Sequence, residues 1–302
     1  MNQQNKIDFT AYLQAKNICE TTIEKYILQI EKFEQWSNAR GGSPQTAQKK
    51  DILDYLQVLQ NRNLSGSTRQ HRLGILAHYY TFLYKTDQTF TNPTTGIKLR
   101  GTRKKVLPSI ITIEEMEELL DTHFLLKVQH TQEKTGNRKG KLEVYRHTHQ
   151  RNHLILSFCI YQGLNRSEWQ ELTLDDIDMQ KATIHIKAQR KTNARILPLH
   201  ATQIGMIYMY LNEARPLFIL NNHLLFNPKF QPHPFIIELK NLYPKFEDFT
   251  QLRASIITYW IKTEGLRKAQ YKAGHRYISS TEQYLANDLE SLKEDITRFH
   301  PI

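Results

Sequence analysis

Four side chains in the C-terminal part of the sequence have the types that phosphodiester chemistry requires, and they are Lys191, Arg253, His275 and Tyr284. Cleavage of a phosphodiester without a metal needs an in-line nucleophile, cations against the phosphoryl oxygens and a proton donor for the departing hydroxyl. An arginine fork can bind two phosphate oxygens at once, and a tyrosine can store the bond energy as a phosphotyrosyl ester. The set therefore predicts cleavage and rejoining of a phosphodiester.

The spacing of Tyr284 from His275 distinguishes it from the other tyrosines. The chain has 15 tyrosines, and a tyrosine on a helix usually serves packing. Tyr284 lies nine residues after His275, which follows Gly274 at the end of a helix that we expect to stop at Ala273. A histidine in that place is, by itself, more typical of a structural helix end. The spacing favours a functional interpretation of both residues.

Arg253 and Lys191 each have an alternative interpretation. Arg253 is expected near the start of a helix whose buried side carries Leu252 and Trp260. It is either a phosphate-binding arginine or an ordinary surface arginine. Lys191 is expected in a turn between two strands, where lysines are common, and Arg190 competes with it for the same role.

The order and spacing of these motifs resemble the tyrosine recombinase, or phage integrase, family. The catalytic domain of that family typically reads Gly-Leu-Arg-x-x-Glu, a hairpin Lys near Lys-Thr-Gly, His-x-Leu-Arg, Leu-Gly-His, and a Tyr at the same distance after that His. The corresponding segments here are Gly163 to Glu168, Lys191-Thr192-Asn193, Thr250 to Arg253, Gly274-His275 and Tyr284. The resemblance covers nearly the whole chain.

The resemblance implies a site-specific DNA recombinase or integrase of a mobile genetic element. Tyr284 would attack a backbone phosphate, form a 3′-phosphotyrosyl intermediate and release a 5′ hydroxyl. Arg253 and Arg166 would hold the phosphate, Lys191 would protonate the leaving oxygen, and His275 would assist proton transfer or donate to the phosphate. No metal and no cofactor is expected, because the covalent intermediate conserves the bond energy.

Two departures from the family pattern leave an alternative open. Asn165 stands where the family has its first arginine, and Arg166 is the next residue, rotated by about 100° on a helix. Thr250 stands in the usual histidine position and can donate only one hydrogen bond. The alternative is a DNA-binding relative with weakened or lost chemistry that acts as an architectural or regulatory partner.

The first 97 residues predict a small helical bundle. Three apolar stripes recur at helical spacing and begin at Ile23, Ile52 and Leu73. The resemblance identifies this bundle as a SAM-like core-binding domain. Arg69 and Arg72 lie on the polar side of the third stripe, where they either face DNA phosphates or form a solvated face.

Residues 98–110 are expected to be a basic interdomain linker. Five cations fall between Asn92-Pro93 and Pro108, and they are Lys98, Arg100, Arg103, Lys104 and Lys105. The run either lies along a DNA backbone or forms a solvated tether. The whole chain has 41 Lys+Arg against 30 Asp+Glu, a net charge of +11. This balance favours a polyanionic partner, and double-stranded DNA is the predicted one.

Residues 111–302 form the predicted catalytic domain, so the fold is expected to be mainly α with a small β-hairpin. Alternation over 183–186 and the run 195–197 predict the two strands of that hairpin. Residues 285–302 predict a tail helix that docks either on a neighbouring protomer or on its own domain. The family resemblance further implies a tetrameric synapse on DNA and an accessory DNA-bending protein.

Other site classes find little support in the sequence. His149 and His153 are four residues apart, but no carboxylate or cysteine close in sequence completes a zinc set, so His147, His149 and His153 are interpreted as exposed histidines in a DNA-facing loop. Cys19 and Cys159 form no disulfide framework or CxxC motif. The absence of a secretory h-region and of a long apolar run predicts a cytoplasmic protein without a membrane partner.

Overall fold

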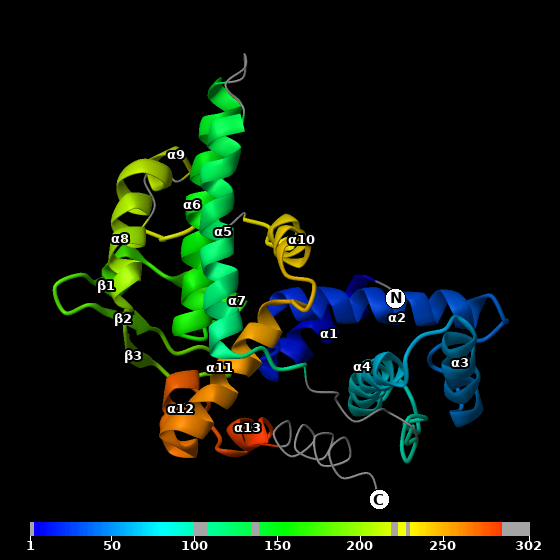
Figure 1. The fold of residues 1–302 in the computed structure, drawn as a ribbon. Helices are drawn as coiled ribbons and strands as arrows, with labels where there is room; N and C mark the ends of the chain where they lie inside the picture. The colour runs from blue at the N-terminus through cyan, green and yellow to red at the C-terminus, as the bar shows by residue number, and fades with distance from the viewer. Residues whose placement is uncertain (1–2, 100–107, 134–138, 219–222, 228–229, 286–302) are drawn as a thin grey trace, which may run out of the picture. The chain divides into compact units, whose positions relative to one another are not determined.

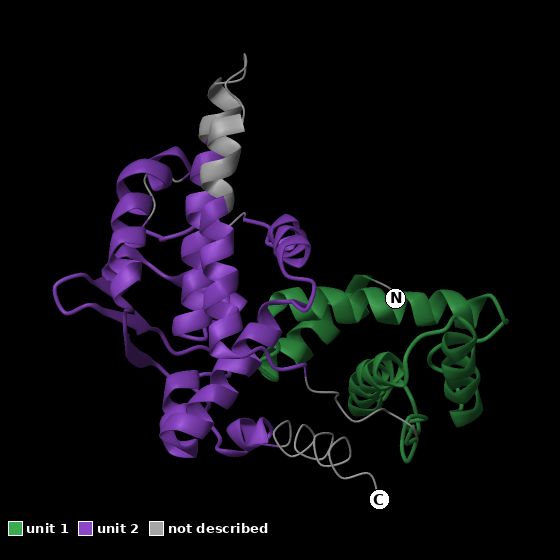
Figure 2. Cartoon of the chain, viewed as in Figure 1, with its two compact units in different colours: residues 1–106 green, residues 107–302 purple. Residues whose placement is uncertain are grey.

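The computed structural model describes residues 3–99, 108–133, 139–218, 223–227 and 230–285. The chain divides into two compact units, 1–106 and 107–302, which Figure 2 shows in different colours. The division falls inside the segment 98–110. Four cations of that segment lie outside the described residues, and they are Arg100, Arg103, Lys104 and Lys105.

The N-terminal unit is a bundle of helices, labelled in Figure 1. Its members are α1 (Gln3–Ala15), α2 (Glu20–Asn38), α3 (Lys49–Asn61) and α4 (Gly66–Lys85). The predicted stripes are confirmed as core, because Ile23, Ile52 and Leu73 are all buried in one apolar cluster. Ser65 caps the helix of the third stripe, and its hydroxyl accepts a hydrogen bond from the Thr68 backbone N–H.

The C-terminal unit is built around one central helix. Its longer helices are α5 (Ile113–Glu133), α6 (Lys139–Tyr161), α8 (Ala201–Met209), α10 (His233–Leu242) and α11 (Phe249–Glu264). Figure 1 shows α5 and α6 side by side as an antiparallel pair, and α8 and α11 also pack on α6. The buried part of α6 therefore has neighbours around most of its circumference, and Leu154, Ile155 and Leu156 are all fully buried.

Shorter elements complete the C-terminal unit around the predicted motifs. They are α7 (Arg166–Glu171), a 3₁₀ turn (Leu174–Asp176), a π turn (Tyr210–Ala214), α9 (Arg215–Phe218), α12 (Leu266–Ala273) and α13 (Ser279–Glu282). The end of α12 at Ala273 agrees with the helix end expected before Gly274-His275. The mainly helical fold class is confirmed.

A three-stranded antiparallel sheet lies beside these helices, in the order β1 (Ile177–Asp178), β2 (Thr183–Ile186) and β3 (Arg195–Pro198). The predicted hairpin of β2 and β3 is confirmed, with Ile184 opposite Leu197, whereas β1 was not predicted. Alternation sends Ile184 and Leu197 inward and Ile196 outward. Arg195 shares the inward face with Leu197, so the first residue on the buried face of β3 is a charged one.

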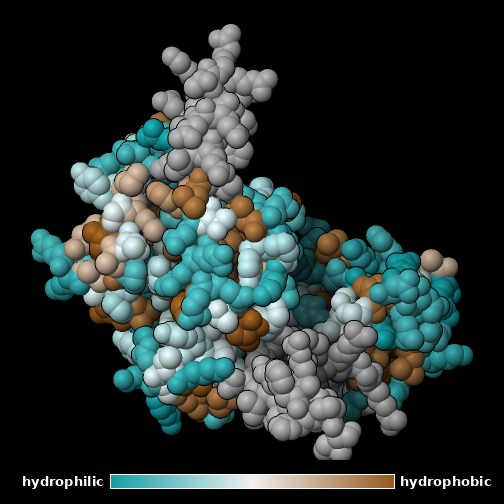
Figure 3. Space-filling view, viewed as in Figure 1, coloured by the Kyte–Doolittle hydropathy of each residue, from teal (hydrophilic) through white to brown (hydrophobic). Residues whose placement is uncertain are grey.

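Hydrophilic residues predominate on the face drawn in Figure 3, and apolar ones are scattered among them. Among the described residues, no helix combines the length and the apolar character that crossing a membrane requires.

Candidate active site

The start of α11 positions Arg253. Asp248 caps the helix, and its Oδ1 accepts hydrogen bonds from the backbone N–H groups of Thr250 at 2.7 Å and Gln251 at 3.0 Å. Arg253 follows one turn later and is only 9% exposed, so its interpretation as a surface arginine is wrong. Thr250 is exposed at the helix start, one turn before Arg253.

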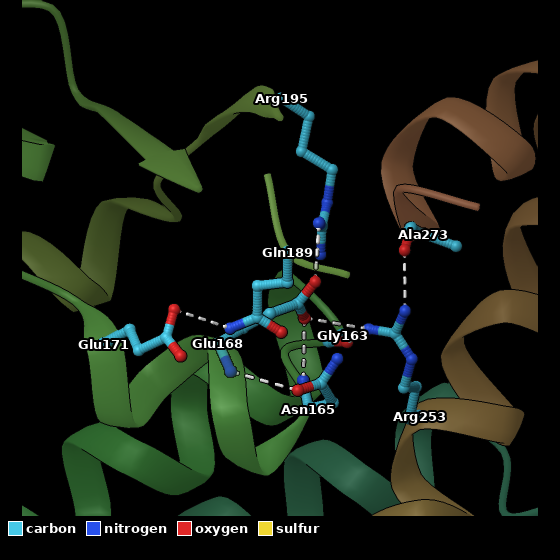
Figure 4. A network of polar contacts seen from close by, with 8 residues as sticks. All are labelled: Gly163, Asn165, Glu168, Glu171, Gln189, Arg195, Arg253 and Ala273. Carbon is cyan, nitrogen blue, oxygen red and sulfur yellow. Dashed lines mark hydrogen bonds and ion pairs between the residues drawn. The ribbon is translucent and has the colours of Figure 1, made fainter. Parts of the chain in front are cut away.

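The Arg253 guanidinium ties three segments together, as Figure 4 shows. Its Nη1 donates to the Gly163 carbonyl oxygen and, at 3.2 Å, to Glu168 Oε2. Its Nη2 donates at 2.6 Å to the carbonyl oxygen of Ala273, the last residue of α12. Because a guanidinium has five N–H groups, these three hydrogen bonds within the described part of the chain leave two donors for another acceptor.

Asn165 serves as the cap of α7. Its Oδ1 accepts from the Glu168 backbone N–H at 3.0 Å, and Glu168 Oε2 accepts from the Asn165 backbone N–H at 2.9 Å. Arg166 is the first residue of that helix and is exposed. Among the described residues, no hydrogen bond or ion pair joins Arg166 to Glu168 or Arg253. The structure therefore does not turn Arg166 into the position that Asn165 occupies.

Glu168 binds a second arginine that the sequence analysis did not select. Arg195 Nη1 donates to Glu168 Oε1 at 2.7 Å, and both side chains are fully buried. The Nε and Nη2 atoms of Arg195 are buried without a hydrogen-bond partner in the described ranges. Burial alone would raise the pKa of Glu168, but the hydrogen bond from Arg195 and the charges of both arginines hold that pKa below its ordinary value.

Two arginines against one carboxylate leave this cluster with a net positive charge. A buried uncompensated charge is costly, and an anion bound beside it would neutralise it. A phosphodiester carries one negative charge, which matches the excess. The signal in the sequence was Arg195 itself, a charged residue on the inward face of an otherwise apolar strand.

Gly274 brings the end of α12 against this cluster. Its φ of 69° is left-handed, and a Cβ there would overlap the Arg195 guanidinium, so only glycine fits. The Gly274 carbonyl oxygen accepts from the Asn193 backbone N–H at 2.8 Å, and Thr192 forms an isolated β-bridge with His275. The turn of the β2–β3 hairpin is therefore fastened to the Gly274-His275 segment.

The hairpin turn also fixes where Lys191 lies. Lys191 directly precedes Thr192, whose backbone pairs with His275, and both Lys191 and Arg190 are exposed. The structure therefore brings the hairpin lysine to the rim of the cluster, and it leaves the choice between Lys191 and Arg190 open.

His275 and Tyr284 stack on each other. Their ring centroids are 6.0 Å apart with an interplanar angle of 8°. His275 Nδ1 lies 2.8 Å from the hydroxyl oxygen of Thr281, near the end of α13, which leaves Nε2 as the other ring nitrogen. Arg253 is close enough to Tyr284 to act on its ionisation. Tyr284, His275 and Arg253 are therefore gathered in one place.

The environment sets the protonation of both rings. Burial, together with the charges of Arg253 and Arg195, lowers the pKa of His275 to about 4. Burial raises the pKa of Tyr284, and the charge of Arg253 opposes that effect. At neutral pH the histidine is a neutral imidazole that can accept a proton, and the tyrosine is a phenol that can lose one.

The DNA-binding candidates of the N-terminal unit have different surroundings. Arg69 is half-buried and its Nη1 donates to Gln60 Oε1 at 2.6 Å. Arg72 is half-buried beside the Tyr55 hydroxyl, whose pKa it lowers against the larger effect of burial. Lys98 is exposed. The remaining linker cations fall outside the described residues.

The sequence is similar to those of known proteins. Residues 7–89 match the family model described as the phage integrase N-terminal SAM-like domain. The chain is 25% identical to the tyrosine recombinase XerC of Natranaerobius thermophilus over 319 aligned positions, covering 98% of each protein.

Solved structures share the fold. The XerH site-specific recombinase bound to a palindromic difH substrate, a post-cleavage complex, superposes with a TM-score of 0.69 at 21% identity, covering 94% of this chain and 81% of that one. The Tn1549 transposon integrase in complex with a circular intermediate DNA gives a TM-score of 0.65 at 16% identity, covering 93% and 94% of the two chains.

Proposed function

We propose that the chain is a tyrosine recombinase that cleaves and rejoins double-stranded DNA at specific sites through a covalent bond to Tyr284. The observation that carries the proposal is the meeting of Arg253 from α11 with His275 and Tyr284 from the segment that follows α12. A phosphoryl transfer to tyrosine requires a phenol, a neutral imidazole and a guanidinium that can donate to the phosphate. Two N–H groups of the Arg253 guanidinium make no hydrogen bond to the residues that the structure describes.

In the proposed cleavage step, the Tyr284 oxygen attacks the phosphorus of a backbone phosphodiester. The phenolic proton passes to His275 Nε2, and the bond between phosphorus and the 5′ oxygen breaks as the bond to tyrosine forms. Lys191 gives a proton to the departing 5′ oxygen, with Arg190 as its competitor. Rejoining is the reverse, when a 5′ hydroxyl attacks the 3′-phosphotyrosyl bond.

The arginines stabilise the negative charge that develops on the phosphoryl oxygens. Arg253 donates its two remaining N–H groups, and Arg195 supplies a second positive charge behind it. Thr250 lies exposed one turn before Arg253 and can add one hydroxyl donor. The net charge of the cluster favours the pentavalent transition state, which carries more negative charge than the bound diester.

The DNA partner is proposed to contact both units. Arg69, Arg72 and Lys98 would bind phosphates from the N-terminal unit, as would the linker cations Arg100, Arg103, Lys104 and Lys105. Four protomers would join two sites, with residues 285–302 docking in cis or in trans and an accessory protein bending the DNA. The similarity to a transposon integrase supports a mobile element as the source of those sites.

A second function is favoured by one observation. Asn165 is used as a helix cap, and Arg166 beside it is exposed, so one preorganised cation of the family pattern is missing. One lost donor to a developing oxyanion costs on the order of 10²–10³ in rate. The second candidate is therefore a DNA-binding relative that regulates or shapes a recombination complex without cleaving.

One experiment separates these candidates. The full chain is incubated with a nicked suicide duplex taken from the DNA flanking its gene, and denaturing gels detect a covalent protein–DNA adduct. Tyr284→Phe should abolish the adduct, whereas Tyr277→Phe, a matched control at a tyrosine that is 72% exposed, should retain it.

The other outcomes decide against the proposal. A band shift without any adduct would support the non-cleaving DNA-binding protein. An adduct that persists in Tyr284→Phe would assign the nucleophile to another residue. The absence of both binding and adduct across the flanking DNA would overturn both candidates.

A further inference from the structure

Three histidines of the C-terminal unit stack in its interior. His123 comes from α5, and His149 and His153 come from successive turns of α6. Their ring planes are nearly parallel, at 13° between His123 and His149 and 5° between His123 and His153. His149 is 2% exposed and His153 is 6% exposed, so their interpretation as exposed loop residues is wrong, as it is for His147.

Hydrogen bonds fix which ring atoms carry lone pairs. His149 Nε2 lies 2.6 Å from the His123 carbonyl oxygen, which can only accept, so Nε2 carries the proton and Nδ1 the lone pair. His123 Nδ1 lies 3.2 Å from His153 Nδ1, and one of the two donates to the other. When His123 is the donor, its Nε2 carries a lone pair.

The Nε2 atom of His123 faces a carboxylate. It is buried without a hydrogen-bond partner in the described ranges, and Glu238 Oε1 of α10 lies 3.8 Å away. That distance is too long for a hydrogen bond. Two ligands of one tetrahedral zinc ion, each bound at about 2.0–2.2 Å, lie about 3.4 Å apart. An ion between the two atoms therefore fits with a small shift of the Glu238 side chain, which is partly exposed.

His149 completes the set. One ligand atom from each of His123, His149 and Glu238 lies within 4.8 Å of the other two. The His123 and His149 rings are stacked with their centroids 4.0 Å apart, and a metal ion lies in the plane of each imidazole that binds it, so one of the two rings turns when the ion binds. Two imidazoles and a carboxylate are a donor set that zinc and its neighbours bind, leaving one position for water. We propose that the C-terminal unit binds one divalent ion of the zinc class through His123, His149 and Glu238.

His153 has a different role in this site. Metal-bound histidines almost always use their second ring nitrogen in a hydrogen bond that fixes the ring orientation and tautomer. The contact between His123 Nδ1 and His153 Nδ1 is such a bond, with His153 accepting. The spacing of His149 and His153 by four residues, noted in the sequence, therefore joins a ligand and its supporting residue on one helix face.

An ion can reach this site. A hollow of about 30 Å³ is lined by His149 and His153 together with Phe124, Gln150, Met206 and Met209. A cavity of this volume is large enough for a water molecule, which needs about 10–15 Å³ by the same measure. Water can thus approach the histidines through this hollow.

The proposed ion joins three helices outside the candidate active site. It links α5, α6 and α10, and α6 leads directly to the Gly163–Glu168 segment. Its role is structural and takes no part in the chemistry at Tyr284. The binding energy of an ion held only by the folded state adds to the stability of that state.

The test uses the full chain without an affinity tag of histidines. After removal of metal by a chelator, Zn²⁺ is titrated by calorimetry and Co²⁺ by visible absorption, with Mg²⁺ as the negative control. We expect one Zn²⁺ per chain, d–d absorption of a nitrogen- and oxygen-ligated Co²⁺, and a rise in thermal midpoint with Zn²⁺ but not with Mg²⁺. Absence of stoichiometric binding, or of the absorption band, would overturn the proposal.

Three variants locate the site. Glu238→Gln removes a partly exposed ligand with little change of shape, and it should weaken Zn²⁺ binding at least about tenfold. His153→Gln should weaken it by about 10–100-fold, the usual cost of losing a supporting partner. His147→Gln is the matched control on the same helix, because His147 is buried but contacts Gln150 instead, and it should leave binding unchanged.

The Zn²⁺ affinities of the variants, compared with that of the wild type, test the site even if one variant folds poorly. Equal Zn²⁺ affinity in the wild type, Glu238→Gln and His153→Gln would place the ion elsewhere and overturn the proposal. Because DNA cleavage is not the readout, failure of the proposed recombinase function would leave the result on metal binding unaffected.

Discussion

Two polar clusters in the interior of the C-terminal unit accommodate their polar groups in different ways. The arginine cluster, formed by Glu168, Arg195 and Arg253, buries permanent charges and pairs them through hydrogen bonds. The histidine cluster, formed by His123, His149, His153 and Glu238, buries imidazoles. Burial, with the neighbouring histidines, lowers the pKa of His123 well below its ordinary value, so that ring is neutral.

The difference shows what each cluster can bind. Two guanidiniums and one carboxylate leave a positive excess, which a phosphate anion can neutralise. Imidazoles beside a carboxylate present lone pairs and a negative charge, which a divalent cation can satisfy. Buried polar groups are stable when their partners are present. The arginine cluster lacks a negatively charged partner, whereas the histidine cluster lacks a positively charged one.

The largest expected effect comes from removing the carboxylate of the arginine cluster. Glu168→Gln leaves two buried guanidiniums without a counter-charge, so we expect unfolding by urea to show a loss of about 3–5 kcal/mol. Added sulfate should restore more stability to this variant than it adds to the wild type, because an anion can replace the lost charge.

Glu171→Gln is the matched control for this prediction. Glu171 is exposed on the same short helix, where a substitution should change stability by no more than about 0.5 kcal/mol. A Glu168→Gln protein as stable as this control, or one indifferent to sulfate, would show that the arginines do not depend on the carboxylate.

A smaller effect is expected where the family pattern is broken. Asn165→Arg removes the side-chain cap of α7, which should cost about 1 kcal/mol, and places a cation beside the arginine cluster. If that cation reaches the phosphate, cleavage of the suicide duplex should become about 10²-fold faster, the lower end of what one donor contributes.

Asn165→Ala separates the two consequences. It loses the same cap without adding a charge, so it should show the stability loss alone. Single-turnover adduct formation and urea unfolding would be measured for both variants. An Asn165→Arg protein that cleaves no faster than Asn165→Ala would show that Arg195 already supplies the charge the missing arginine would give.

The parts of the arginine cluster that are close in sequence could be predicted. The functional interpretation of His275 and Tyr284 follows from a fixed spacing within one segment, and the helix that begins near Arg253 follows from its apolar side. The pairing of Glu168 with Arg195 could not be predicted in this way. It joins a helix and a strand separated by 27 positions, and periodicity describes each of them alone.

The histidine cluster was less predictable for a physical reason. The buried part of α6 is covered by α5, α8 and α11, so its buried residues do not form the single apolar stripe by which a surface helix is identified. His149 and His153 therefore look like polar surface residues in the sequence. Their partners His123 and Glu238 come from two other helices, and only the packing of all three brings a carboxylate near the imidazoles.

The smallest expected effect concerns pH, and it depends on the charge of the arginine cluster. The ordinary pKa of histidine is 6.5, whereas that of folded His275 is lowered to about 4. As pH falls below the ordinary value, the unfolded chain binds this proton first. The contribution of neutral His275 to stability is therefore complete above pH 6.5 and is lost as the pH falls toward 4.

A comparison of the wild type with His275→Asn isolates this contribution, because other titrating groups are common to both. Between pH 7.5 and pH 5, the thermal midpoint of the wild type should fall by roughly 2–4 °C more than that of the variant. Adduct formation by the wild type should show no step near the ordinary pKa of histidine, since the imidazole that accepts the Tyr284 proton stays neutral there. A step at that pH would mean that burial and the two arginines together do not lower the pKa of His275.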